Sequence, residues 1–445
     1  MRRLIAAAGL GAILLAALPA GRAAALSAGA ASIEIAVPAG TPLAGYGGFP
    51  RRAWLPGVLG GSPHAFWFKS SEGVHDAPRA RALLLEAGAT RVLWLAVDLV
   101  GVDPTLVEEL RERLARGGHR YSAVIVSASH THSGPGAFAH SALFAFVAVD
   151  RFSAEVRARI LEALEGAARQ AEARKGPALV GAGRAEVTVV ARSRLGAPLD
   201  PELGLLKVVA PDGRPLAVVW NYAIHGTALG RDNFHLSGDL MAEASRRIEG
   251  RLEAPALYVS GAAADVSPGR RGWEGVREAG AALSAAALAA WDGITPEPDG
   301  TLAALVGRVT LPDPSLRLRN CVGRWIPRWA RVSLGGALPT SADMVALAVG
   351  RSGWITIPGE LQTQLGQDIK AAGRARFAHV FVASVSNDYL GYFLTREAFD
   401  RSKYIACASL YGEGGGEAMG AAATALLLRL AGTVPGGGPP GGTPR

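Results

Sequence analysis

Six short, almost continuously apolar runs, separated by amphipathic stretches of helical periodicity, constrain the fold of this chain more than any other feature. The apolar runs occupy residues 91–100, 122–129, 216–225, 256–261, 354–359 and 379–386. The helical stretches occupy residues 104–118, 154–176, 239–252, 276–291 and 361–373. Apolar strands that alternate with amphipathic helices are typical of a sheet covered on both faces. We therefore predict an α/β fold, a layered α/β/α domain with a mixed central sheet.

Length and composition fit a large globular chain. The 445 residues correspond to two domains, or to one large α/β domain, at roughly 100–200 residues per domain. The formal net charge is +8, or about +5 (8 minus 3) once the three arginines at positions 2, 3 and 22 are removed with a leader. No clustered run of lysine and arginine accompanies this charge, so we expect no nucleic-acid partner.

The first 25 residues have the organisation of a secretory signal peptide. A basic start precedes the apolar stretch Leu4–Leu18, and "AAA" at 23–25 fits a cleavage site. The alternative is an uncleaved anchor, but this stretch is shorter than the ~20 residues that a membrane span needs. We predict a signal peptide over 1–25, a catalytic domain over 26–431 and a disordered Pro/Gly-rich tail over 432–445. The protein would then be secreted or periplasmic, where Cys321 and Cys407 could form one disulfide.

Chemically capable side chains follow five of the six apolar runs. They are His130 and His132, His225, Asp265 and Ser267, Glu360, and the group Asn387, Asp388, Tyr389 and Tyr392. In open α/β sheets, ligands bind outside the carboxyl ends of the strands. The alternative is that polar residues simply end strands, but chance would less often choose histidine, glutamate and tyrosine. We expect the active site at this edge.

Two histidines and a carboxylate in this set suit a metal ion. His130 and His132 are two residues apart at a strand end, so both side chains can face one pocket about 6–7 Å apart. His225 adds a further nitrogen and Glu360 a carboxylate, a donor set that fits zinc or a similar divalent ion with a position left for water. The alternative for each histidine alone is an ordinary hydrogen-bonded polar residue, because a single His-x-His pattern is a weak signal.

Five motifs in a fixed order resemble the neutral (alkaline, non-lysosomal) ceramidase family. They are "SASHTHSGPG", "NYAIHGTALG" with "HLSGD", "ADVSPG", "IPGEL" and "SNDYLGYFLTREAF", and the resemblance spans roughly residues 32–420. It implies a zinc ion held by four ligands, His130, His225, Glu360 and Tyr392. The residues alone would not select Tyr392 over Tyr389, or His130 over His132.

The resemblance also assigns four residues around the metal. His132 would stay off the ion and move protons near the substrate, and Ser267, Arg192 and Tyr404 would be active-site residues. Ser267 could be a nucleophile or, beside an activated water, a hydrogen-bonding group for substrate. Without the resemblance, Ser267 would be interpreted as a turn serine, Arg192 as a surface arginine and Tyr404 as a core tyrosine.

The implied function is that of an exported zinc-dependent amidohydrolase, which cleaves the N-acyl linkage of ceramide to sphingosine and a fatty acid. One alternative is the same chemistry on another N-acyl or ester compound. A second alternative is a non-catalytic lipid- or glycan-binding protein with the same fold, although a pure binder has no need of an open metal position. The expected partner is a lipid-like N-acyl substrate.

The stretch 316–334 mixes two tryptophans, Trp325 and Trp329, with five arginines. Such a mixture can make transient contact with a membrane surface, where a lipid substrate would reside. Pro327 interrupts any helix there, so the ordinary interpretation is a packed loop with solvated arginines.

Overall fold

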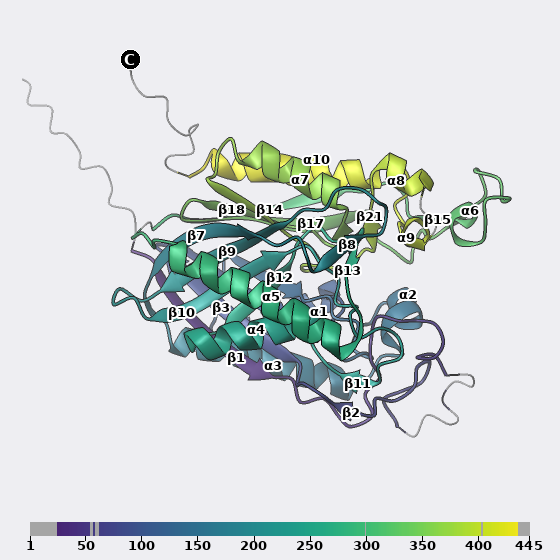
Figure 1. Ribbon diagram of the computed structural model, residues 1–445, viewed down its shortest axis with the longest axis horizontal. Helices are drawn as coiled ribbons and strands as arrows, with labels where there is room; N and C mark the ends of the chain where they lie inside the picture. The colour runs from purple at the N-terminus through teal and green to yellow at the C-terminus, as the bar shows by residue number, and fades with distance from the viewer. Residues whose placement is uncertain (1–24, 54–56, 58–61, 299, 402–403, 435–445) are drawn as a thin grey trace, which may run out of the picture.

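The computed structural model describes residues 25–53, 57, 62–298, 300–401 and 404–434 (Figure 1). The predicted signal peptide, apart from residue 25, and residues 435–445 of the predicted tail lie outside the described residues. The last described helix, α10 (Gly415–Ala431), ends where the catalytic domain is predicted to end. Within the described ranges, no helix is both long and apolar enough to span a bilayer.

The first sheet has the strand order β5-β4-β3-β1-β6. Its strands are β1 (Ser27–Glu34), β3 (Arg79–Ala87), β4 (Thr90–Val97), β5 (Ala123–Ala128) and β6 (Gly176–Pro177). Alternate residues of β4 point to opposite faces. Leu93 and Leu95 pack with residues of helices α1 (Pro104–Arg116) and α3 (Ala154–Ala173) on one face, whereas Trp94 faces the other sheets.

Two four-stranded sheets lie on the far side of the first sheet. The second sheet, β12-β10-β9-β7, contains β7 (Leu179–Glu186), β9 (Glu202–Val209), β10 (Pro215–Tyr222) and β12 (Ala256–Ser260). The third sheet, β14-β17-β18-β20, contains β14 (Leu302–Thr310), β17 (Ser341–Val349), β18 (Ser352–Thr356) and β20 (His379–Ala383). The Asn221 amide joins their edges, because it donates to the carbonyls of Val259 on β12 and Val382 on β20.

Four helices cover the outer faces of these two sheets (Figure 1). Helices α4 (Asp239–Leu252) and α5 (Gly272–Gly293) pack on the second sheet. Helices α7 (Thr363–Gly373) and α10 pack on the third. The layers are therefore, in order, helices α1 and α3, the first sheet, the second and third sheets side by side, and the four outer helices. The predicted α/β class is confirmed, and its central layer consists of several sheets because strands such as β4 are apolar on both faces.

The core between the sheets is built on large aromatic rings. Trp94 of β4 meets Trp354 of β18 edge to face at 5.0 Å, and Trp354 lies 4.4 Å from Phe381 of β20. All three side chains are buried. Aromatic pairs in this geometry stabilise a core beyond the area that they bury, so the first and third sheets are held in a fixed relation.

Three parallel strand pairs fix where the polar strand ends meet. β4 pairs with β5, β10 with β12, and β18 with β20, all in parallel. Parallel neighbours have their carboxyl ends at the same edge. Two bridges between the sheets, Ser127 with Ser386 and Thr131 with Gly226, bring the loops after β5, β10 and β20 together, as the sequence predicts for the functional residues.

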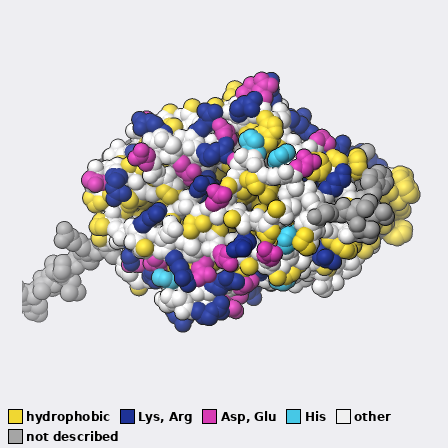
Figure 2. Space-filling model, turned by 90° about the horizontal axis from the view of Figure 1, so that it is seen from below, with side chains coloured by type: hydrophobic (Ala, Val, Ile, Leu, Met, Phe, Trp, Pro, Cys, Tyr) yellow, Lys and Arg dark blue, Asp and Glu magenta, His cyan; other side chains and the backbone are white. Residues whose placement is uncertain are grey.

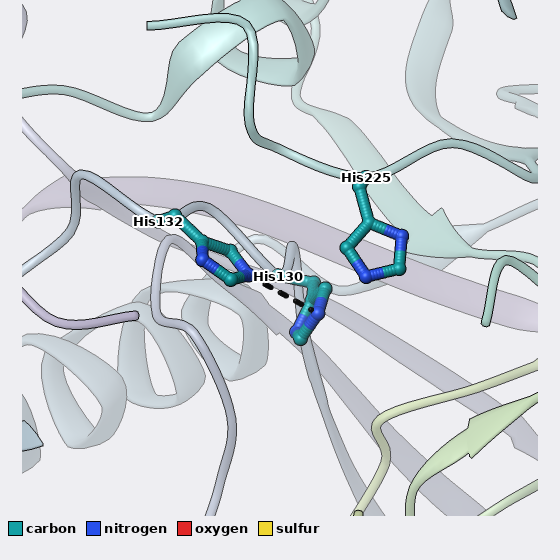
Figure 3. Close-up of side chains that lie close together, drawn as sticks. All are labelled: His130, His132 and His225. Carbon is teal, nitrogen blue, oxygen red and sulfur yellow. Dashed lines mark hydrogen bonds between the residues drawn. The ribbon is translucent and has the colours of Figure 1, made fainter. Parts of the chain in front are cut away.

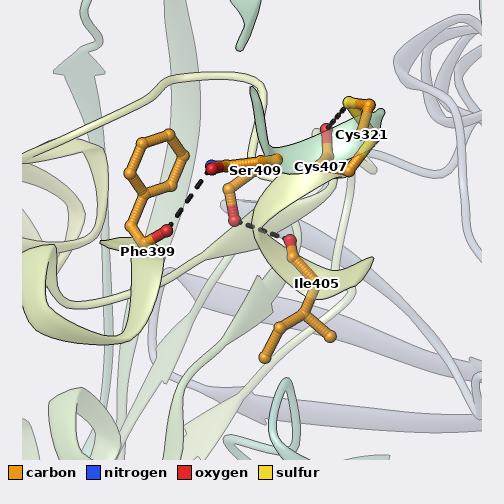
Figure 4. The surroundings of a disulfide bond; sticks show 6 residues. Cys321, Phe399, Ile405, Cys407 and Ser409 are labelled. Carbon is orange, nitrogen blue, oxygen red and sulfur yellow. Dashed lines mark hydrogen bonds between the residues drawn. A yellow bond between two sulfur atoms is a disulfide. The ribbon is translucent and has the colours of Figure 1, made fainter. Parts of the chain in front are cut away.

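Short elements fill the region beyond these strand ends. The strands are β2 (Gly73–Val74), β8 (Ala191–Ser193), β11 (His235–Leu236), β13 (Val266–Pro268), β15 (Ser315–Arg317), β16 (Arg331–Ser333), β19 (Glu360–Leu361) and β21 (Tyr392–Phe393). The helices are α2 (Ala142–Phe144), the π-helix η1 (Ala145–Val149), α6 (Leu318–Cys321), α8 (Arg396–Arg401) and α9 (Tyr404–Cys407). Cys321 and Cys407 form a disulfide that ties α6 to α9 (Figure 4).

Candidate active site

Three loops bring His130, His225 and Glu360 into direct contact. The His225 Nε2 atom lies 2.7 Å from Glu360 Oε2, and the His130 Nε2 atom lies 3.3 Å from the same oxygen. All three side chains are buried. Residues that are 230 positions apart in the chain (360 minus 130) thus share one point in space. The sequence prediction that strand-end residues converge is met by the geometry of these three.

The backbone around His130 orients its ring for binding through Nε2. His130 has a φ of 62°, a left-handed conformation that is costly for a residue with a side chain and is found at functional sites. Its backbone N–H donates to Leu99 O, and its Nδ1 lies 2.6 Å from Val100 O. A carbonyl can only accept, so the proton sits on Nδ1 and the lone pair of Nε2 faces Glu360.

The contact between His225 and Glu360 has the character of two ligands that face a shared cation. Although they are 2.7 Å apart, neither His225 Nε2 nor Glu360 Oε2 has a hydrogen-bond partner among the described residues. Burial, followed by the positive charge of Arg194, lowers the pKa of His225 to about 3, so its ring is neutral. Burial would raise the pKa of Glu360, but the charge that His130 and His225 carry when protonated outweighs it and holds this pKa well below its usual range. An ionised carboxylate and neutral imidazoles are the forms that bind metal ions.

A third histidine, His132, completes a buried group that could hold a metal ion. Its Nε2 lies 3.4 Å from His130 Nε2, and one nitrogen from each of His130, His132 and His225 lies within 4.8 Å of the others (Figure 3). Burial, followed by the charge of His130, lowers the pKa of His132 well below its usual value. Arg51 donates to the His132 carbonyl, and the Tyr46 ring packs on the imidazole at 4.9 Å.

The two candidate tyrosines occupy different positions. Tyr389 donates from its hydroxyl to Glu360 Oε1 at 2.6 Å, so it holds the carboxylate oxygen that does not face the histidines. Tyr392 stands opposite Glu360 in the parallel pairing of β19 with β21. Its ring lies parallel to that of His225 at 6.4 Å, and its hydroxyl accepts from Arg194 Nη1 at 3.5 Å. Burial, followed by the charge of Glu360, raises the pKa of both tyrosines well above 10.

The arginine that contacts the site is Arg194 and not the predicted Arg192. Arg192 pairs with Ser267 through the backbone of β8 and β13, but its side chain is exposed. Arg194, two residues further on, donates from Nε to Ser267 Oγ at 2.7 Å and from Nη1 to Ala264 O and Tyr392. The physical reason is position along the strand: β8 ends at Ser193, and only a side chain beyond its end reaches inward.

Tyr404 stands at the rim of the site. Its side chain is 72% exposed, which differs from the core position that the residues alone would suggest. Its hydroxyl still lies close enough to Glu360 and Arg194 for both charges to act on its pKa, which burial raises first. This tyrosine can therefore meet a molecule that enters from solvent.

Residues 64–266 match the family described as neutral/alkaline non-lysosomal ceramidase, N-terminal. The match covers 203 of the 445 residues (266 minus 64, plus 1), and over this part the chain is similar to that family. This part carries His130, His132, Arg194 and His225, and it ends one residue before Ser267. Glu360 and the tyrosines lie beyond it, so their connection to the ceramidase segment comes from the contacts described above.

Individual relatives and solved structures extend this similarity. The chain is 25% identical over 210 residues to the neutral ceramidase of Pseudomonas aeruginosa, a match that covers 43% of this chain and 31% of that protein. It is 28% identical over 204 residues to neutral ceramidase 2 of Arabidopsis thaliana, over 41% and 27% of the two chains. The chain thus aligns with about a third of the length of these ceramidases. The crystal structure of the P. aeruginosa neutral ceramidase has the same fold, with a TM-score of 0.79, 19% identity and coverage of 93% of this chain and 75% of that one.

Two residues that contact the candidate site were not among those selected from the sequence. Arg194 is in the same "ARSR" stretch as Arg192, and only the end of β8 distinguishes them. Tyr46 lies in "AGYGG", where the flanking Gly45 has a φ of 101° and a Cβ there would lie 2.5 Å from the His132 ring. A tyrosine between glycines, at a place where the backbone must pass close to a ring, is a signal that could have been used.

Proposed function

We propose that this protein is a zinc-dependent amidohydrolase that cleaves the N-acyl linkage of ceramide to sphingosine and a fatty acid. The observation that carries the proposal is the buried convergence of His130, His225 and Glu360, in which the facing His225 Nε2 and Glu360 Oε2 atoms have no hydrogen-bond partner among the described residues. Buried polar atoms are normally paired, and a divalent cation pairs all three side chains at once. The match of residues 64–266 to the ceramidase family supports the reaction class.

The proposed ligands are His130, His225, Glu360 and Tyr392. Two imidazoles and a carboxylate suit zinc, and Tyr392 is the phenol opposite Glu360 in the β19–β21 pair. When bound, such an ion polarises a carbonyl and lowers the pKa of water to about 7. Tyr389 positions the Glu360 carboxylate through its short hydrogen bond, a kind of support that fixes ligand orientation.

His132 is proposed as the group that moves protons. It lies beside the ligands without the tautomer-fixing carbonyl contact that His130 makes, and its Nδ1 has no partner within the described part of the chain. The ring nitrogen that faces the ligands is Nε2, 3.4 Å from His130 Nε2, and an imidazole nitrogen in that position can accept a proton from water and return it to the leaving amine. The backbone contact with Arg51 and the packing of Tyr46 keep this ring in place.

Ser267 is proposed as a substrate ligand and not as a nucleophile. Its Oγ accepts a hydrogen bond from Arg194 Nε, and a guanidinium cannot act as the base that a serine nucleophile needs. The same guanidinium is placed to stabilise negative charge on the acyl oxygen, together with the Tyr392 hydroxyl. Tyr404 would orient the substrate at the rim, and the arginine role expected of Arg192 passes to Arg194.

Ceramide is the proposed substrate because the relatives are named neutral ceramidases, and a solved structure with the same fold is described as a ceramidase complexed with C2. We further propose that the protein is secreted or periplasmic. The disulfide between Cys321 and Cys407 supports this location, because such bonds persist in oxidising compartments. The signal-peptide pattern over residues 1–25 agrees with it.

Metal analysis combined with a substrate panel tests the proposal. Purified protein should contain zinc and release fatty acid from ceramides, and a chelator should remove both the metal and the activity. Release from N-acyl amino acids or esters but never from ceramide would assign the same chemistry to another substrate. Lipid or glycan binding without metal-dependent release of any acyl group would overturn the enzyme and leave a binding protein.

A further inference from the structure

The segment 315–334, the Trp/Arg arm, projects from the end of the molecule that carries the candidate site. It consists of β15, α6, the following loop and β16, and it extends beyond the layers (Figure 1). Trp325 is 78% exposed and Trp329 is 81% exposed, and Val322 is 61% exposed. A folded protein normally covers such large apolar side chains, so exposed tryptophans on one arm indicate a contact surface. The packed loop, the ordinary interpretation of the sequence, is not what forms.

The arm is held in place at its base. The disulfide joins Cys321 to Cys407 of α9, and Asn320 donates to the carbonyl of Phe399 (Figure 4). Arg317 is buried and forms salt bridges with Asp400 and Glu413. These bonds fix the root while the tryptophans beyond it remain exposed. The exposure is therefore a feature of an ordered element.

The charge of the arm favours an anionic partner. Residues 315–334 contain five arginines and no acidic residue. Arg317 is neutralised at the base, whereas Arg324, Arg328 and Arg331 are exposed and form no salt bridge with any described residue. Tryptophan is enriched where a membrane meets water, and arginine near it is attracted to anionic headgroups. A soluble acidic protein would use the charges but has less need of two protruding indoles.

A second apolar projection lies on the other flank of the site. Phe146 and Val147 on η1 are each 51% exposed. Phe144, the residue just before η1, stacks on Tyr389, whose hydroxyl donates to Glu360. On the arm's flank, the disulfide leads to α9, which begins at Tyr404. Both projections are at the same end of the molecule, and Figure 2 shows hydrophobic side chains gathered there.

We propose that the Trp/Arg arm is a membrane-docking element that inserts Trp325 and Trp329 into the interface of an anionic lipid surface. Phe146 and Val147 would touch the same surface, so the site would open toward the lipid between the two projections. The docking rests on the proposed function, because its role would be to bring the site to a lipid substrate. Vesicle binding itself can be measured without any turnover.

Vesicle sedimentation of the full chain tests the docking. The protein should bind vesicles of phosphatidylcholine, and more tightly when phosphatidylglycerol is included, with the difference screened by salt. Trp325→Ser/Trp329→Ser should weaken binding to both vesicles by about tenfold or more. Arg324→Gln/Arg328→Gln should weaken only the anionic component, by about fivefold for each arginine. Leu428→Ser on α10 and Arg116→Gln on α1, which are exposed elsewhere, should bind like the wild type.

The outcomes separate this inference from the proposed function. If the wild type releases fatty acid from a short-chain soluble ceramide but does not bind vesicles, the docking is overturned and the function stands. If it binds vesicles through Trp325 and Trp329 but releases no acyl group, the docking stands and the function fails. If the double tryptophan variant instead turns a dimer into a monomer in sedimentation analysis, and vesicle binding is absent, the docking is overturned and the arm is a protein interface.

Discussion

The buried His/Glu cluster and the exposed Trp/Arg arm differ in how the fold supports them. His130, His225 and Glu360 are almost completely buried and are fixed by strands on several sides, whereas Trp325 and Trp329 are anchored only at the root of the arm. In the cluster, removing one side chain takes a polar contact away from buried neighbours that water cannot reach, which is costly. On the arm, a change removes surface that has no partner within the chain. The cluster should therefore be intolerant and the arm tolerant of substitution.

The largest effect that this comparison predicts is at His225. His225→Ala should lose both bound metal and activity, because it removes one of the two proposed imidazole ligands that face Glu360. His132→Ala should lose activity but keep most of the metal. Metal content by mass spectrometry, measured beside turnover, distinguishes the two variants. The reverse pattern would mean that His132 and not His225 is the ligand.

A smaller effect on activity is expected for Arg194, just beyond the end of β8, and almost none for Arg192 within β8. Arg194→Gln removes the guanidinium that contacts Ser267 and Tyr392, and we expect kcat/KM to fall by about 10²–10³-fold, as for loss of one preorganised donor. Arg192→Gln is the matched control, since its side chain is exposed, and it should change kcat/KM less than about twofold. Equal losses in both variants would contradict the assignment of Arg194.

The loop before the tyrosines should make stability depend on pH. Burial raises the pKa of Asp388 to about 7, although its carboxylate also accepts from the Tyr389 amide. A raised pKa means that the folded state binds this proton more tightly than the unfolded state. Protonated Asp388 therefore contributes to the free energy of unfolding. This stabilisation is complete below about pH 4 and decreases as the pH rises toward about 7, by on the order of 2–4 kcal/mol in total.

Asp388→Asn supplies the test of this pH dependence. The introduced amide cannot ionise, so it removes the titration while keeping the shape of the side chain. Urea unfolding at about pH 5 and about pH 7, within the range between the two pKa values, should therefore give more similar free energies of unfolding for the variant than for the wild type. An unchanged difference would show that other groups cause the loss of stability.

The smallest expected effect lies on the arm. Trp325→Ser/Trp329→Ser should change the free energy of unfolding by no more than about 0.5 kcal/mol per site, because surface substitutions away from packed features cost little. Thermal unfolding by circular dichroism measures it. A loss of several kcal/mol would show that the indoles are packed in solution, and the contrast with the cluster would disappear.

The parts of the fold that depend on short-range pattern could be predicted from the sequence. The alternation of apolar runs and helices predicted the α/β class, and polar residues after the strands indicated the edge at which His130, His225 and Glu360 meet. The division of the central layer into several sheets could not be predicted, because apolar strands such as β4 do not specify whether a helix or another sheet covers each face.

The remaining site details depend on side-chain direction over a few ångströms. Whether Arg192 or Arg194 reaches Ser267 depends on where β8 ends. Whether Tyr389 or Tyr392 bonds to Glu360 depends on the loop between β20 and β21. The exposure of Trp325 and Trp329 depends on how the arm leaves the core. None of these is encoded in the periodicity or spacing of the sequence.

The pairing of β19 with β21 fixes how many residues can connect Ser386 to Tyr392. Ser386 is bridged to Ser127 at one end, and Tyr392 stands opposite Glu360 at the other. Inserting one residue between Ser386 and Tyr392 would bring Gly391 opposite the Glu360 carboxylate, and deleting one would bring Phe393 there, in place of the phenol. In this chain, substitutions within the connection should therefore disturb the β19–β21 register less than a change in its length would.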